Sequence, residues 1–249
     1  MKRWLLRLTL LGFVVWIAAC AAMLAFRHHL IYPFRDWPSA HQVSGLPGAE
    51  AVNVKAADGN PITVWRVKAH AGKPDILHFT GNAGSLPSSG PRLAELALQG
   101  YGIVAMNYRG AAGAPGSPTQ IQIVSDAMAV YDAFANVPPV VYGTSLGAAV
   151  AVQLAARRPV RALVLEAPFA SLCETAQTHY PVIPACWLLW DERWDSMAAI
   201  DAHTGPLLVM HGAADRVIPI SQARALYSAA NEPKKFIAYP EGRHNDLRL

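Results

Sequence analysis

The pattern of hydrophobic and polar positions divides the chain into an apolar N-terminal run and a longer part of alternating character. Residues 8–26 are 19 consecutive residues without a charged side chain. A stretch rich in proline, glycine and serine follows, and from residue 51 short apolar runs alternate with helix-length segments. The pattern therefore predicts an N-terminal membrane anchor at residues 1–30, a linker at residues 31–50 and a folded domain at residues 51–249.

The folded part opens with the signal of a β-hairpin. Residues 51–55 and 62–68 alternate between apolar and polar side chains, and a turn that contains Asp58 and Gly59 separates them. Two such runs around a turn of this composition favour a pair of antiparallel strands.

The rest of the domain predicts an α/β fold. Six short apolar runs read as strands, at residues 76–80, 102–108, 139–143, 162–167, 206–211 and 235–239. The segments between them predict helices at residues 90–99, 119–136, 146–157 and 220–230. Nearly continuous apolar strands that alternate with helices are typical of a mostly parallel sheet with helices on both faces.

Residues 169–203 break this alternation. The segment carries three tryptophans and two prolines but few regular helix signals. An insertion of this kind above the strand ends is often a lid or a binding surface, and the alternative is an irregular connection at the edge of the core.

The N-terminal run is long enough to cross a membrane. A helix over residues 8–26 rises about 28 Å, close to the thickness of a hydrocarbon core. Lys2, Arg3 and Arg7 precede it, and Arg27, His28, His29 and Arg35 follow it, so the flanking charges specify the orientation only weakly. The first cluster favours a cytoplasmic N-terminus and a domain on the exported side. A signal peptide cleaved near Ala19 and a lipoprotein modified at Cys20 stay open as alternatives. We favour a retained single-pass span because the apolar run continues beyond Cys20.

Composition and charge exclude several classes of protein. The chain is 53% hydrophobic and 15% charged, which excludes a disordered chain or a coiled coil. Much of the net charge of +4 comes from the three residues before the apolar run, and no basic stripe follows, so we expect no nucleic-acid partner. The cysteines lack metal-site spacing. Cys173 and Cys186 are expected as two buried thiols, with one disulfide as the alternative in an oxidising compartment.

One short motif carries the chemistry. Residues 143–147 read Gly-Thr-Ser-Leu-Gly, between a predicted strand and a strongly apolar helix. A sharp turn from strand to helix exposes a serine hydroxyl, and the helix N-terminus favours negative charge that develops there. The motif resembles the nucleophile turn of α/β-hydrolases, and it predicts Ser145 as a nucleophile.

A serine nucleophile needs a base and an acid that orients the base. In α/β-hydrolases these follow the serine in the order acid, then histidine, each after a later strand. Asp215 follows the predicted strand at residues 206–211, and His244 follows the strand at residues 235–239. We therefore predict Asp215 as the acid and His244 as the base. His211 is expected to be structural, and Asp246 competes less well as the acid because it follows the histidine.

The oxyanion of an acyl-transfer intermediate needs two preorganised N–H donors. The backbone N–H of Leu146, directly after the nucleophile, is the first candidate. The second is expected from the loop after residues 76–80, where Asn82 is preferred and Ala83 is the fallback.

Together these motifs resemble the α/β-hydrolase superfamily. They also include Asn107-Tyr108-Arg109-Gly110 and the segment at residues 167–172. The similarity is strongest to a membrane-anchored branch related to serine aminopeptidases and protein depalmitoylating thioesterases. That resemblance implies the α/β-hydrolase fold and a serine hydrolase activity.

Three features depart from the family pattern. Thr80 stands where the family has a histidine before the oxyanion glycine, and residues 111–116 are richer in alanine. These changes are expected to alter loop packing and a pocket wall. Only five residues follow His244, so we expect a mobile loop there.

The sequence therefore predicts acyl transfer to water on an ester or thioester, with a small-molecule substrate or an acylated or lipidic one. The mechanism requires no metal and no organic cofactor. A peptidase or an acyltransferase with the same three residues, and a non-catalytic membrane-tethered binding module, are the alternatives. The pattern does not decide the oligomeric state.

Overall fold

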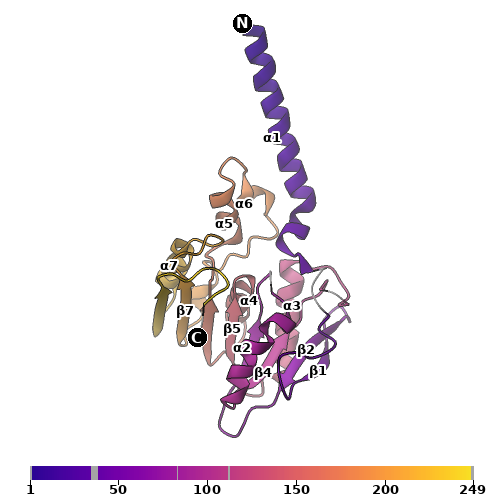
Figure 1. Cartoon of the computed structure of the whole chain (residues 1–249), viewed down its shortest axis with the longest axis vertical. Coiled ribbons are helices and arrows are strands. Elements are labelled where there is room, and N and C mark those ends of the chain that lie inside the picture. Colours follow the sequence, from indigo (N-terminus) through magenta and orange to yellow (C-terminus); the bar gives the residue numbers. More distant parts are fainter. Residues whose placement is uncertain (1, 35–38, 83, 112, 248–249) are drawn as a thin grey trace.

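The computed structural model describes residues 2–34, 39–82, 84–111 and 113–247. It has one long helix that projects from a domain built around an eight-stranded sheet (Figure 1). The strands are β1 (Glu50–Lys55), β2 (Pro61–Val67), β3 (Asp75–Phe79), β4 (Gly102–Met106), β5 (Val140–Thr144), β6 (Ala162–Glu166), β7 (Leu207–Gly212) and β8 (Lys234–Tyr239). The helices are α1 (Lys2–Ile31), α2 (Leu86–Leu98), α3 (Gln120–Phe134), α4 (Leu146–Ala155), α5 (Leu172–His179), α6 (Ala185–Leu188) and α7 (Ile220–Ala229), with a 3-10 turn, η2, at Ile200–Ala202.

The sheet is mixed but mostly parallel. Its strand order is β1-β2-β4-β3-β5-β6-β7-β8. The predicted hairpin is present, because β1 pairs with β2 in antiparallel fashion and β2 pairs in the same sense with β4. All other pairs are parallel, so the carboxyl ends of β3 to β8 lie along one edge of the sheet. The predicted α/β-hydrolase architecture is confirmed.

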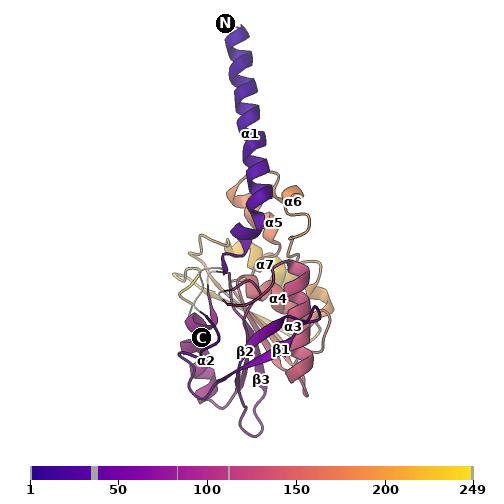
Figure 2. The same ribbon diagram turned by 90° about the vertical axis from the view of Figure 1, so that its right-hand side faces the viewer.

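Helices cover both faces of the sheet. Apolar side chains of α3, α4 and α7 share one core cluster with the sheet, and α4 is buried along its whole length. Leu86 and Leu93 of α2 pack into a second cluster, together with Ala40 and Leu46. Figure 2 shows α2 and α3 on opposite sides of the strands.

Helix α1 is long and apolar enough to cross a membrane, and the window of it that would do so has no side chain buried in the protein. It extends well beyond the domain in both views (Figures 1 and 2). The residues after it are not a free tether, although the sequence pattern predicts a linker there. Tyr32, Phe34 and Leu46 are buried, and the Trp65 indole donates a hydrogen bond of 2.7 Å to the carbonyl of Ala40.

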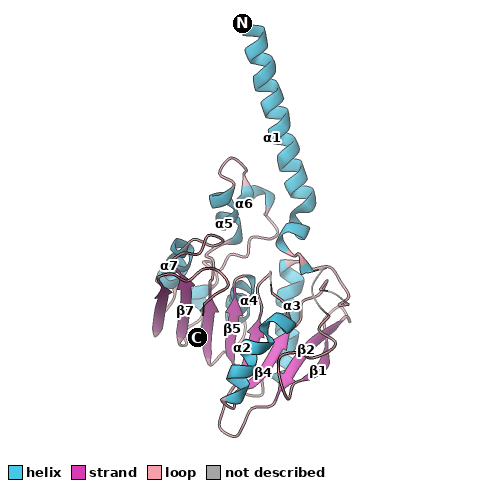
Figure 3. Cartoon of the chain, in the orientation of Figure 1, coloured by secondary structure: helices cyan, strands magenta, loops and turns pink. Residues whose placement is uncertain are grey.

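The segment at residues 169–203 contains more regular structure than its sequence indicates. It forms two short helices, α5 and α6, beside the lower half of α1 (Figure 3). A disulfide joins Cys173 in α5 to Cys186 in α6. The expectation of two free thiols is therefore wrong. The two residues are close because α5 and α6 pack against each other, a contact that the sequence pattern does not reveal.

Candidate active site

Ser145 lies in the sharp turn between β5 and α4. Its backbone adopts φ 54° and ψ −117°, a region that costs a non-glycine residue free energy and is found at functional turns. The turn closes because Gly143 and Gly147 have no side chain: a Cβ on Gly147 would overlap the backbone of Phe79 and Thr80. The Ser145 N–H also donates a 2.8 Å hydrogen bond to the carbonyl of Glu166, which attaches the turn to β6.

The structure brings the three predicted catalytic side chains together. His244, in the loop after β8, has Nε2 3.1 Å from Oγ of Ser145. Its other ring nitrogen, Nδ1, lies 2.7 Å from Oδ2 of Asp215 in the loop after β7. All three residues are buried. The imidazole therefore sits between a hydroxyl and a carboxylate, in the arrangement that acyl-transfer catalysis requires.

Asp215 is held as a carboxylate by its own loop. Its Oδ1 accepts hydrogen bonds from the backbone N–H groups of Val217 at 2.8 Å and Ile218 at 2.9 Å. Burial raises the pKa of Asp215, but the hydrogen bond to His244 and those from Ile218 and Val217 outweigh it, so the pKa stays below its ordinary value. The side chain of Asp215 is therefore ionised at neutral pH.

The acid loop and the histidine loop are connected through their backbones. The Ala214 N–H donates a 3.0 Å hydrogen bond to the carbonyl of Gly242. Gly212 permits this approach, because a Cβ there would overlap the backbone of Gly242 and Arg243. The contact fixes His244 relative to Asp215, although 29 positions separate them in the sequence.

Neither competing residue takes the place of the predicted acid or base, although His211 lies beside the acid, with Nε2 3.4 Å from Oδ2 of Asp215. His211 is fully buried, and its Nε2 lies 2.9 Å from the carbonyl of Ile218, to which it donates. Burial lowers the pKa of His211, which favours the neutral ring expected of a structural residue. Asp246 accepts a hydrogen bond from the N–H of Arg243 in its own loop.

The predicted oxyanion donors flank the nucleophile. Leu146 is the first residue of α4 and is buried. Across the site, Gly81 lies so close that a Cβ there would be 3.2 Å from the Cβ of Ser145. Asn82 is half-buried beside it and donates its side-chain amide to the carbonyl of Ile31 at 3.3 Å. The fallback, Ala83, lies outside the described residues.

Thr80 holds this loop where the family pattern has a histidine. Its carbonyl accepts a 2.7 Å hydrogen bond from the hydroxyl of Tyr108. Its own hydroxyl accepts one of 3.2 Å from Ser89 on α2. The loop is therefore tied to both α2 and the segment that follows β4 without a histidine.

A pocket of about 360 Å³ opens beside Ser145. Its wall comes from the loop after β3, from α2 and from the histidine loop. Many of its side chains are polar, among them Thr80, Asn82, Ser88, Ser89, Arg92 and Asn245. This lining suits a substrate that carries hydrogen-bonding groups near its reactive carbonyl.

Sequence reasoning missed a polar cluster at the floor of this pocket. Arg92 donates to the carboxylate of Glu166 and, at 2.9 Å, to the hydroxyl of Tyr142, which also donates to Glu166. His78 lies beside Tyr142, and neither of its ring nitrogens has a hydrogen-bond partner in the described part of the chain. Burial, with Arg92 nearby, lowers the pKa of His78 to about 3, so it is neutral. The one sequence signal was a charged residue, Glu166, at the end of an apolar strand.

Comparisons with known proteins show the family of the chain. A family model described as serine aminopeptidase, S33, matches residues 89–191, which include Ser145. An uncharacterized protein of Mycobacterium tuberculosis is 36% identical over 220 residues, which cover 85% of this chain and 77% of the relative. The chain belongs to the α/β-hydrolase family.

Other members of this hydrolase family are similar at lower identity. The lysophosphatidylserine lipase ABHD12 of Danio rerio is 30% identical over 225 residues, which cover 76% of this hydrolase and 58% of the relative. The crystal structure of the Pyrococcus furiosus esterase Pf2001 superposes with a TM-score of 0.64 at 16% identity and covers 79% of this hydrolase and 84% of the esterase. The similarity to the esterase shows only that the two folds are alike.

Proposed function

We propose that this hydrolase cleaves ester or thioester bonds through an acyl-enzyme on Ser145. The observation that carries the proposal is the position of His244, within 3.1 Å of the Ser145 hydroxyl and 2.7 Å of the Asp215 carboxylate. A serine hydroxyl becomes a strong nucleophile only when such a base accepts its proton as it attacks.

Each residue has a defined role in the proposed reaction. Ser145 Oγ attacks the substrate carbonyl while its proton passes to Nε2 of His244. Asp215 holds Nδ1–H of the ring and stabilises the imidazolium. The N–H groups of Leu146 and Asn82 bind the oxyanion, and His244 then protonates the leaving group. Water activated by the same histidine releases the acid and regenerates Ser145.

The proposed substrates have an acyl chain and a polar part. The apolar helix α1 and the similarity to a lysophosphatidylserine lipase support a lipidic or acylated substrate. The polar pocket beside Ser145 supports a substrate whose other part forms hydrogen bonds. Since the family model that matches is described as a serine aminopeptidase, hydrolysis of small peptides with the same three residues is the second candidate.

We further propose that α1 is a retained membrane anchor and that the domain lies on the exported side. The cluster of Lys2, Arg3 and Arg7 before the apolar run supports this orientation. The Cys173–Cys186 disulfide supports it too, because disulfides persist mainly outside reducing compartments.

Covalent labelling with a fluorophosphonate probe tests the proposed nucleophile. The detergent-solubilised wild-type protein is expected to be labelled, and Ser145→Ala and His244→Ala are expected to lose labelling. We also expect hydrolysis of a short-chain p-nitrophenyl ester to fall by roughly 10⁴-fold or more in either variant.

Ser228→Ala is the matched control, because Ser228 is exposed on α7 and its hydroxyl donates to the carbonyl of Arg224 in the same helix. It should keep full labelling. A folded wild type that the probe does not label would overturn the proposed function.

A further inference from the structure

The tip of the α5–α6 segment carries an unusual amount of exposed apolar surface. We define the insertion tip as Tyr180, Val182, Trp187 and Trp190, whose exposed fractions are 53%, 73%, 72% and 67%. Large exposed apolar side chains that occur together mark a site where a protein contacts a membrane or another apolar surface.

The insertion tip lies against the apolar helix. The indole Nε1 of Trp16 donates a 2.7 Å hydrogen bond to the carbonyl of Val182. Trp16 is ten residues before the end of the apolar run at Phe26, a distance of about 15 Å along a helix. Whatever phase surrounds the half of α1 nearer the domain therefore surrounds the insertion tip as well.

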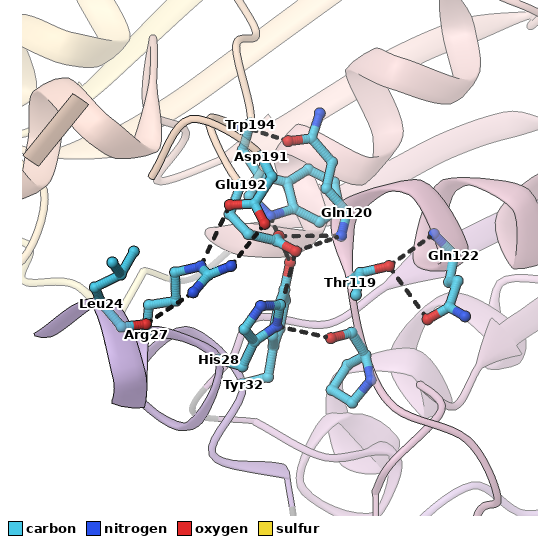
Figure 4. A network of polar contacts seen from close by, with 11 residues as sticks. Leu24, Arg27, His28, Tyr32, Thr119, Gln120, Gln122, Asp191, Glu192 and Trp194 are labelled. Carbon is cyan, nitrogen blue, oxygen red and sulfur yellow. Dashed lines mark hydrogen bonds and ion pairs between the residues drawn. The ribbon is translucent and has the colours of Figure 1, made fainter. Parts of the chain in front are cut away.

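A polar network below the insertion tip fixes this arrangement. Arg27, at the end of the apolar run, forms a salt bridge of 2.8 Å with Asp191 (Figure 4). Tyr32 donates to the adjacent Glu192, which also accepts the backbone N–H of Gln120 on α3. The contacts join α1, the segment after α6 and the domain, so the helix and the insertion tip are held side by side.

The carbonyl groups of residues 180–184, at the start of the insertion tip, are paired as a phase without water requires. In such a phase every unpaired N–H or carbonyl costs several kcal/mol. All five carbonyls from Tyr180 to Pro184 accept a hydrogen bond, from the Gln177 side chain, the Trp16 indole or backbone N–H groups that follow. Pro181 and Pro184 have no N–H to satisfy.

We propose that the insertion tip enters the same lipid bilayer as α1 and forms a second membrane contact of this hydrolase. Tryptophan and tyrosine prefer the region between headgroups and hydrocarbon, and Arg27 with Asp191 lies toward the aqueous side of it. The contact turns the carboxyl edge of the sheet, with Ser145, toward the membrane, because the end of α1 touches Asn82 at that edge. The inference rests on the proposed membrane anchor but not on the proposed catalysis.

Labelling from within the bilayer tests this contact. The full-length protein is placed in nanodiscs of phosphatidylcholine that carries a photoactivatable diazirine on its acyl chain, and labelled peptides are mapped by mass spectrometry. We expect label on residues 8–26 and on residues 180–190. Leu98 and Val137, exposed by 84% and 69%, precede β4 and β5 at the opposite edge of the sheet and should stay unlabelled.

A charge substitution at the insertion tip gives a second readout. Trp187→Glu with Trp190→Glu is expected to abolish labelling of residues 180–190 while residues 8–26 stay labelled. The matched pair Leu98→Glu with Val137→Glu should change neither signal.

Each other outcome overturns the inference. Label on residues 8–26 alone refutes the second contact and keeps the anchor. No label on either segment refutes both. Label on Leu98 and Val137 as strong as that on residues 180–190 refutes a preferential contact between the insertion tip and the bilayer.

Discussion

At the scale of single residues, the role proposed for Asp215 predicts a large effect of one substitution. Asp215→Asn keeps an oxygen for the N–H groups of Val217 and Ile218 but removes the charge that stabilises the imidazolium. We expect kcat for ester hydrolysis to fall by roughly 10⁴-fold with little change in KM. A loss of less than tenfold would show that another group orients His244.

The same substitution predicts a change in acid stability. The pKa of Asp215 is lowered in the folded protein, so its ionised form stabilises the fold at pH values above the ordinary pKa of 3.8. This contribution is lost as the pH falls through the lowered pKa. In denaturant unfolding, wild type is therefore expected to exceed Asp215→Asn in stability at pH 6 and to lose that advantage in acid. A constant difference across this range would contradict the prediction.

The positions of Ser145, Asp215 and His244 could be predicted because each residue follows an apolar strand, and these strands end at the same sheet edge. The cluster of Arg92, Tyr142 and Glu166 could not. Its members come from α2, β5 and β6, and only the packing of that helix across those strands brings them together.

At the scale of elements, helices with a simple apolar pattern were predicted almost to the residue. The segments expected at residues 119–136, 146–157 and 220–230 correspond to α3, α4 and α7. Helix α2 starts earlier than residue 90, because its first turn reads Leu-Pro-Ser-Ser, which resembles a loop. Ser85 caps that turn by accepting the N–H of Ser88, and proline is tolerated at such a start.

The α5–α6 segment was the element least visible in the sequence. Its helices are short, and their positions depend on contacts with distant partners, among them Trp16 and Arg27 of α1. A disulfide and hydrogen bonds to distant segments produce no periodic pattern of apolar residues in the sequence. Only the interruption of the α/β alternation could therefore be predicted.

The disulfide makes a testable contribution to this element. Cys173→Ser with Cys186→Ser opens a loop of 13 residues, which is expected to lower the free energy of unfolding by roughly 3 kcal/mol. For a domain of this size that corresponds to a fall in Tm of about 6–12 °C, measured by calorimetry in detergent. Cys20→Ser, which breaks no disulfide, is the control. An unchanged Tm would mean that the segment unfolds independently of the domain.

At the scale of the whole molecule, the proposed anchor and orientation predict where the domain is found. A C-terminal alkaline phosphatase fusion, active only after export, should show high activity in a bacterial host, and a fluorescent-protein fusion that folds in the cytoplasm should be dark. Replacing Lys2, Arg3 and Arg7 with glutamate is expected to reduce export, since the positive cluster favours the cytoplasmic side. The opposite pair of signals would place the domain in the cytoplasm.

The contact between Asn82 and the carbonyl of Ile31 has a kinetic consequence. It joins the loop beside Ser145 directly to the end of α1, so an anchored molecule holds its active site at a fixed height above the lipid. If the substrate is a lipid of the same bilayer, as proposed, it arrives by lateral diffusion in two dimensions. The rate should follow the mole fraction of substrate in the leaflet, and adding inert lipid at constant total substrate should slow the reaction by dilution of the surface.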